Sequence, residues 1–150
     1  LNIILSQMEN IITGSETNMG PILHRTADLI KKKGLIIFIS DLFDDPDEII
    51  SGLKHFRYKG HEIIVFHILD PQELNLNFSK RTRFIDMESK EHITTEPWHF
   101  KTDYKKSVQS FCNYYKTNCL KNKIDYILIN TETKLDIALS DYLLKRKRMQ

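Results

Sequence analysis

Acidic and hydroxyl side chains come directly after three short apolar runs in this chain of 150 residues. The three groups are Ser40-Asp41, Asp70-Pro71 and Asn130-Thr131, and Asp44 and Asp45 follow the first of them closely. If the apolar runs are neighbouring parallel strands, their carboxyl ends meet at one edge of the sheet, where α/β proteins bind ligands. Carboxylate oxygens suit a hard cation such as Mg²⁺. The pattern therefore predicts a divalent cation at this edge, more than a phosphate.

Local structural roles compete with metal binding at these residues. Asp45 precedes Pro46 and stands three residues before Glu48, a spacing that favours a helix cap over a site residue. Asp41 lies too far upstream to cap that helix, so a turn-forming role and a metal-binding role are equally open for it. Thr17 fits the start of a helix better than it fits a ligand, from the pattern alone.

Other kinds of site lack the residues they need. The chain has five glycines, and no Gly-rich loop follows an apolar run, which argues against nucleotide binding. No Gly-x-Ser-x-Gly sequence occurs, so there is no candidate serine nucleophile of that kind. The six histidines are scattered, and none stands four residues from another, which argues against a zinc site. His67 lies within an apolar run and is expected to be buried with one hydrogen-bonded nitrogen.

The elements that must position these residues alternate between helices and short strands, which is typical of an α/β domain with a parallel sheet. We expect helices over residues 1–12, 21–33, 46–59, 104–119 and 135–144, and sheet strands over 35–39, 62–68 and 126–129. Residues 82–87 and 92–95 are expected to form a small two-stranded insertion. The run Leu35–Ile39 is continuously apolar, which predicts a strand covered on both faces.

The composition fits one soluble domain that spans residues 1–150. Apolar residues make up 41% and charged residues 28%, and a chain this long buries roughly 70% of its unfolded surface. The 22 Lys and Arg balance the 20 Asp and Glu, which argues against a general nucleic-acid binder. No apolar run approaches the length of about 20 residues that a membrane span needs. We expect a cytoplasmic chain. It starts at Leu1, which leaves open a longer parent protein attached to a membrane through a missing N-terminal part.

The two cysteines, Cys112 and Cys119, lie seven residues apart on one expected helix. At the helical rise their Cα atoms are about 10.5 Å apart, farther than the roughly 7 Å that a disulfide allows. We therefore expect two buried, reduced thiols, which favours the cytosol.

Four segments together resemble the bacterial family called domain of unknown function 58. They are Lys33–Pro46, Gly60–Glu73, Thr82–Glu88 and Ile124–Thr131. The resemblance covers nearly the whole chain. It implies a von Willebrand factor A-like domain, a Rossmann-like three-layer sandwich that holds Mg²⁺ in a metal-ion-dependent adhesion site. It also implies a MoxR-type AAA+ ATPase as partner. The family has no assigned activity.

Within that resemblance, Thr17 matches the lone threonine of the metal site and Asp41 matches its later aspartate. The family's early Asp-x-Ser-x-Ser strand is absent, so the domain is expected to be N-terminally incomplete and to bind Mg²⁺ weakly or not at all. In von Willebrand A domains that early strand pairs with the strand matched here by Leu35–Ile39. Its absence is expected to leave Leu35–Ile39 at an edge of the sheet, open to pairing with a second copy in a homodimer.

Two functions of different classes follow. The first is a non-enzymatic protein-interaction module, in which a metal ion held in an open shell accepts an acidic side chain of a protein partner as its last ligand. Its partner-binding face is formed by Thr17, Asp41, Asp44 and Asp45. The second is a metal-dependent hydrolase, such as a nuclease, in which Asp41, Asp44 and Asp70 gather at adjacent strand ends around Mg²⁺. The lack of a nucleophile and of a nucleotide loop favours the interaction module.

Overall fold

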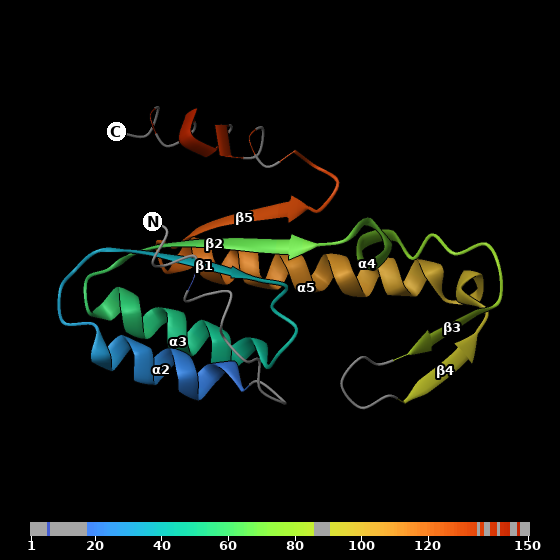
Figure 1. The fold of residues 1–150 in the computed structure, drawn as a ribbon, viewed down its shortest axis with the longest axis horizontal. Coiled ribbons are helices and arrows are strands. Elements are labelled where there is room, and N and C mark those ends of the chain that lie inside the picture. The colour runs from blue at the N-terminus through green and yellow to red at the C-terminus, as the bar shows by residue number, and fades with distance from the viewer. Residues whose placement is uncertain are drawn as a thin grey trace.

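The computed structural model describes residues 18–85 and 91–134, together with the single positions 6, 136, 139, 140, 142–144 and 147. Its elements, in chain order, are α2 (Met19–Leu29), β1 (Leu35–Ser40), α3 (Pro46–Tyr58), β2 (Glu62–Leu69), α4 (Pro71–Asn75), β3 (Thr82–Ile85), β4 (His92–Thr95), a 3₁₀ turn (Pro97–His99), α5 (Lys101–Lys121) and β5 (Asp125–Asn130). Figure 1 shows α2 and α3 side by side below the sheet, and the β3–β4 hairpin standing away from it.

A parallel sheet in the order β1-β2-β5 forms the centre of the fold. Helix α3 connects β1 to β2, and α5 lies on the longer connection from β2 to β5, as parallel neighbours require. The predicted α/β class, the mainly parallel sheet and the separate antiparallel hairpin β3–β4 are confirmed. This arrangement is compatible with a Rossmann-like fold.

The main core lies between one face of the sheet and helices α2, α3 and α5. Alternate strand residues such as Ile63 and Val65 point into it, because side chains of a strand alternate between its two faces. Gly52 sits where α2 and α3 touch, and a Cβ on it would come within 2.5 Å of the Leu23 Cβ. The glycine therefore allows the two helices to approach closely.

The opposite face of the sheet is covered unevenly. Ile64, Phe66 and Ile129 are buried, and Leu139 and Tyr142 pack against them. On β1, the side chains of Leu35, Ile37 and Ile39 remain 48%, 53% and 62% exposed. The expectation that this strand is covered on both faces is therefore wrong. The reason is its position, because β1 lies at the edge of the described sheet and pairs there with β2 alone.

Several further sequence predictions can be compared with the structure. The helix expected over 21–33 ends at Leu29, although Lys31 still donates a hydrogen bond to the Asp28 carbonyl near its end. Cys119 is buried but Cys112 is only half-buried, so the expectation of two buried thiols is wrong for Cys112. The helix expected over 1–12 falls almost entirely outside the described residues. Of the helix expected over 135–144, positions 136, 139, 140 and 142–144 are described and all of them are helical.

Candidate functional site

The loop that follows β1 is held in a fixed turn by side-chain acceptors. Ser40 Oγ accepts a hydrogen bond from the Leu42 N–H at 3.0 Å, and Asp41 Oδ1 accepts one from the Phe43 N–H at 3.2 Å. Leu42 has a left-handed backbone (φ 61°) and is fully buried, and its carbonyl accepts a hydrogen bond from the Tyr115 hydroxyl. Asp41 therefore has the turn-forming role, one of its two predicted alternatives.

Asp44 uses both carboxylate oxygens inside the protein. Oδ2 accepts a hydrogen bond of 2.7 Å from the Met19 N–H, the first of α2, and Oδ1 accepts one of 2.7 Å from the Asp45 N–H. These two bonds hold the pKa of Asp44 below its ordinary value of 3.8, and the bond from Met19 contributes more than the bond from Asp45. The carboxylate therefore stays ionised and acts as the cap of α2, whose own N-cap residue, Asn18, makes no side-chain cap bond.

Asp45 caps the next helix, as its spacing predicts. Its Oδ1 accepts hydrogen bonds from the Asp47 and Glu48 N–H groups at the start of α3. Asp47 in turn accepts a hydrogen bond from the Tyr114 hydroxyl, which raises the pKa of Tyr114 to about 12. The loop and the first turn of α3 thus place five acids within eight residues: Asp41, Asp44, Asp45, Asp47 and Glu48. We call this segment, Asp41–Glu48, the acidic loop.

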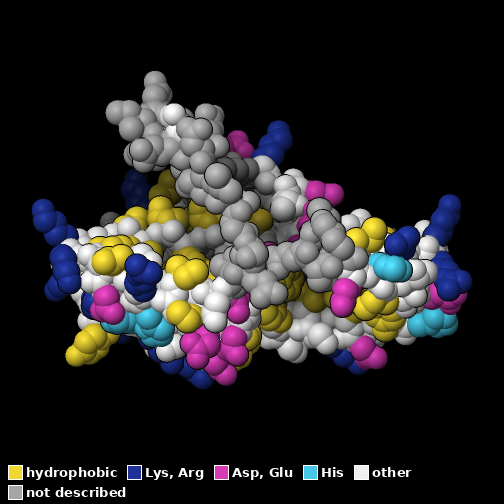
Figure 2. Space-filling model, turned by 60° about the horizontal axis from the view of Figure 1, so that its bottom comes forward, with side chains coloured by type: hydrophobic (Ala, Val, Ile, Leu, Met, Phe, Trp, Pro, Cys, Tyr) yellow, Lys and Arg dark blue, Asp and Glu magenta, His cyan; other side chains and the backbone are white. Residues whose placement is uncertain are grey.

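One aromatic side chain projects from the acidic loop. Phe43 is 57% exposed, and its ring stacks on Phe111 of α5 with centroids 5.5 Å apart. Its N–H donates a hydrogen bond to Asp41 Oδ1, and the carbonyl of the preceding residue, Leu42, accepts one from the Tyr115 hydroxyl. Figure 2, which brings the side of the helical layer forward, shows acidic side chains gathered there in one main group. The acidic loop therefore carries an exposed aromatic ring that is packed against α5, together with five acids.

Asp70 lies apart from this loop. The register aligns Ser40 with His67, so β2 runs on for two more residues before Asp70 begins α4. Asp70 caps that helix in a capping box with Glu73, and its Oδ2 accepts a hydrogen bond from the Thr131 hydroxyl. Among the described residues, no three His, Cys, Asp or Glu side chains are placed to share a metal ion. The expected gathering of Asp41, Asp44 and Asp70 is therefore not formed.

Behind the acidic loop, His67 is fully buried. Its Nδ1 is 2.6 Å from the Tyr126 hydroxyl, while Nε2 is buried with no hydrogen-bond partner among the described residues. Burial lowers the pKa of His67, and the Asp41 backbone and charge oppose this only in part. The histidine is neutral at pH 7, with one bonded nitrogen, as predicted.

Thr17, the other predicted metal ligand and partner-binding residue, lies outside the described residues. Of the remaining predicted site residues, the structure brings Asp41, Asp44 and Asp45 together on one loop. Two of these three are helix caps and the third holds a turn. The described residues therefore do not make up a Mg²⁺ shell of six oxygen ligands.

Sequence patterns gave no sign of two other features. One is an apolar cavity of about 490 Å³ between α4, α5 and the hairpin, lined mainly by Leu76, Phe78, Phe84, Ile93, Phe100 and Tyr104. The other is a contact between His24 of α2 and His55 of α3, whose Nδ1 atoms lie 3.1 Å apart. These histidines are 31 positions apart in the sequence, and a search for metal ligands along one helix does not pair them.

Comparisons with protein-family models, with curated proteins and with solved structures found no match to this chain. None of the helices that the structure describes is long and apolar enough to cross a membrane.

Proposed function

We propose that this chain is a non-enzymatic protein-interaction module that binds its partner through the acidic loop. The observation that carries the proposal is Phe43, an aromatic side chain 57% exposed on a loop that is held by hydrogen bonds of Asp41 before it and of Asp44 after it. Exposed aromatic anchors that lose little conformational freedom contribute strongly to protein interfaces. Fixing the loop in advance lowers the entropy that binding must overcome.

The roles of the acids support binding rather than catalysis. The carboxylates of Asp44 and Asp45 accept hydrogen bonds from backbone N–H groups, and the pKa of Asp44 is lowered. A general acid or base works best with a pKa near the operating pH. A carboxylate would need a raised pKa for this, whereas the pKa of Asp44 is lowered. Burial also raises the pKa of both thiols, that of Cys119 to about 12, which makes them poor nucleophiles.

The charge of the loop indicates the kind of partner. The acidic loop carries five acids within eight residues that include Phe43, so the complementary surface carries Lys or Arg around an apolar pocket, and association is faster at low ionic strength. The resemblance to domain of unknown function 58 supplies a partner class, a MoxR-type AAA+ ATPase, and the finer assignment of the fold as von Willebrand factor A-like.

A direct binding measurement tests the proposal. The purified MoxR-type ATPase of the source organism is titrated against the wild type and the Asp41→Asn/Phe43→Ser double variant. Asn at position 41 keeps the turn acceptor and removes the charge. Tyr58→Ser is the matched control, because Tyr58 is 91% exposed at the far end of α3. We expect the double variant to bind at least about tenfold more weakly and the control to bind normally. Equal binding by all three proteins would remove this face from consideration.

A further inference from the structure

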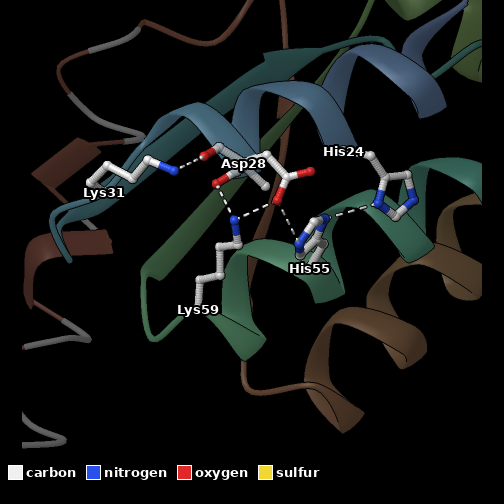
Figure 3. A network of polar contacts seen from close by, with 6 residues as sticks. His24, Asp28, Lys31, His55 and Lys59 are labelled. Carbon is white, nitrogen blue, oxygen red and sulfur yellow. Dashed lines mark hydrogen bonds and ion pairs between the residues drawn. The ribbon is translucent and has the colours of Figure 1, made fainter.

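Helices α2 and α3 bring two imidazole rings into contact through their nitrogens, on the side of the fold that carries the helical layer. Gly52 of α3 allows the two helices to approach closely at Leu23 of α2. Leu23 stands one position before His24, and Gly52 stands three positions before His55. The ring nitrogens Nδ1 of His24 and His55 then lie 3.1 Å apart, as Figure 3 shows. The rings are tilted by 41°, so they meet through their nitrogens and do not stack.

This separation matches the spacing of two ligands on one metal ion. Zinc–imidazole bonds are about 2.0–2.1 Å long, so two ligands of a tetrahedral ion are about 3.3 Å apart. In square-planar geometry, which Cu²⁺ and Ni²⁺ favour, neighbouring ligands at a similar bond length are about 2.9 Å apart. We propose that Nδ1 of His24 and Nδ1 of His55 form a binding site for one divalent transition-metal ion of the Cu²⁺, Ni²⁺ and Zn²⁺ class.

The surroundings of His55 support the required orientation. Asp28 Oδ1 lies 3.5 Å from His55 Nε2, on the opposite side of the ring from His24. A carboxylate beside the second nitrogen is the usual partner of a metal-binding histidine, because it keeps the proton on that nitrogen and leaves the other lone pair for the metal. Asp28 is itself held by Lys59, whose Nζ is 2.6 Å from the same oxygen.

Lysine contacts fix this arrangement at the helix ends. Lys59 Nζ also donates to the Ala27 carbonyl at 3.0 Å, and Lys31 Nζ donates to the Asp28 carbonyl at 3.1 Å. Lys59 thus ties the C-terminal ends of α2 and α3 together beside the ring contact, while the Lys31 bond lies within the end of α2. Metal binding requires both rings to carry their proton on Nε2, and the ion then lies to one side of the line that joins the two Nδ1 atoms, because the midpoint of that 3.1 Å line is closer to each nitrogen than a metal–nitrogen bond length.

The site is open and has two protein ligands. The His55 side chain is 25% exposed, so water or a ligand from a partner can complete the coordination shell. Among the described residues there is no third His, Cys, Asp or Glu placed to join the pair. Affinities should follow the general order for nitrogen ligands, with Cu²⁺ strongest and Mg²⁺ not bound. The site is independent of the acidic loop and of the proposed function.

Calorimetric titration of the untagged chain with Ni²⁺, Zn²⁺ and Mg²⁺ tests this inference. The variants His24→Gln and His55→Gln remove one imidazole each and keep a polar side chain of moderate size. His92→Gln is the control, since His92 is an exposed histidine on β4. Circular dichroism checks the fold of every variant. In a Cys112→Ser background, which removes a half-buried thiol, the electron paramagnetic resonance spectrum of the Cu²⁺ complex counts the bound nitrogens.

We expect the wild type and His92→Gln to bind one Ni²⁺ or Zn²⁺ per chain and to leave Mg²⁺ unbound. Each of the two Gln variants should bind at least about tenfold more weakly, and the Cu²⁺ spectrum should show two imidazole nitrogens in the wild type and one in either variant. Asp28→Asn should weaken binding by about tenfold without loss of a nitrogen. The inference is overturned if the wild type shows no stoichiometric binding, or if folded His24→Gln and His55→Gln variants bind as the wild type does.

Discussion

The Asp44 carboxylate accepts a hydrogen bond of 2.7 Å from the Met19 backbone N–H, across 25 positions of sequence. A residue of the loop after β1 thus caps the helix that precedes that strand. The N-terminal N–H groups of a helix need acceptors, and here the nearest polar residue in sequence, Asn18, does not supply one. The start of α2 and the acidic loop are therefore one structural unit.

Replacement of Asp44 by Asn should lower the melting temperature by a few degrees at pH 7, because α2 loses a charged cap. The folded pKa of Asp44 is lowered, so its contribution is present above the unfolded value, near 3.8, and is lost as the pH falls through the folded value. The difference from the wild type should therefore shrink below about pH 4. Thermal unfolding at pH 7 and pH 3 measures this. Asn18→Ala is the control and should have little effect, and an equal loss in both variants would contradict the assignment of the cap.

His67 should make the stability of the wild type depend on pH. Its folded pKa is lowered by burial, so the unfolded chain takes up a proton below about pH 6.5 that the folded chain resists. Stability is lost as the pH falls below that value, by up to about 1.4 kcal/mol per pH unit. Urea unfolding between pH 5 and pH 8 should show this slope in the wild type and in His92→Phe. His67→Phe should lack it, and the same slope in that variant would assign the effect to another group.

The two thiols should react at different rates. Cys112 is half-buried and Cys119 is fully buried, and burial raises the pKa of both. A thiol reagent at pH 8 should modify Cys112 slowly and Cys119 only after unfolding in urea. Because the two residues stand seven positions apart on α5, oxidants should not join them within one chain. Rapid modification of both thiols in the folded protein would show that the core beside α5 opens readily.

The edge strand β1 should promote self-association. It carries three half-exposed apolar side chains and pairs, within the described sheet, with β2 alone. Such an edge can pair with a second copy across a two-fold axis. We expect sedimentation velocity to detect a dimer and Ile37→Lys to reduce it, while Tyr58→Lys, on exposed α3 surface, leaves it unchanged. A folded wild-type monomer of 17.8 kDa at high concentration would contradict this prediction.

Magnesium should bind with millimolar or weaker affinity, through Thr17 and Asp41 if at all. Asp41 Oδ1 already accepts the Phe43 N–H, and Asp44 is occupied by two backbone groups. Calorimetry with Mg²⁺ measures this affinity, with Asp41→Ala as the paired variant. Micromolar binding that Asp41→Ala abolishes would mean that the loop rearranges around the ion.

The sequence predicted the strands and the long helix well, because their apolar periodicity is local. Capping by Asp45 was equally clear, since Pro46 and Glu48 stand beside it. Capping by Asp44 was not predictable, because its partner Met19 is distant in sequence and near only in the folded chain. The same reason applies to His24 and His55.

The exposure of β1 was missed for a different reason. A continuously apolar strand is typical of the centre of a parallel sheet, and this pattern indicated cover on both faces. The resemblance, by contrast, predicted an edge position for Leu35–Ile39, and within the described sheet β1 does lie at an edge. Asp41 was left open between two roles because a turn and a ligand need the same oxygen. The hydrogen bond from the Phe43 N–H to Asp41 supports the turn. The position of Asp70 relative to Asp41 follows only from the register between β1 and β2.

The order of pairing in the sheet has a consequence for how the chain folds. Contacts between the first two strands are comparatively local, as in the bond from the Gly34 N–H to His61 Nδ1 over 27 positions. The contact of His67 with Tyr126 closes a loop of 59 positions, which contains the hairpin and α5. Closing the longer loop costs more entropy and slows folding. The unit from α2 to β2 should therefore assemble first and serve as the template on which β5 docks. During synthesis it can form before β5 leaves the ribosome.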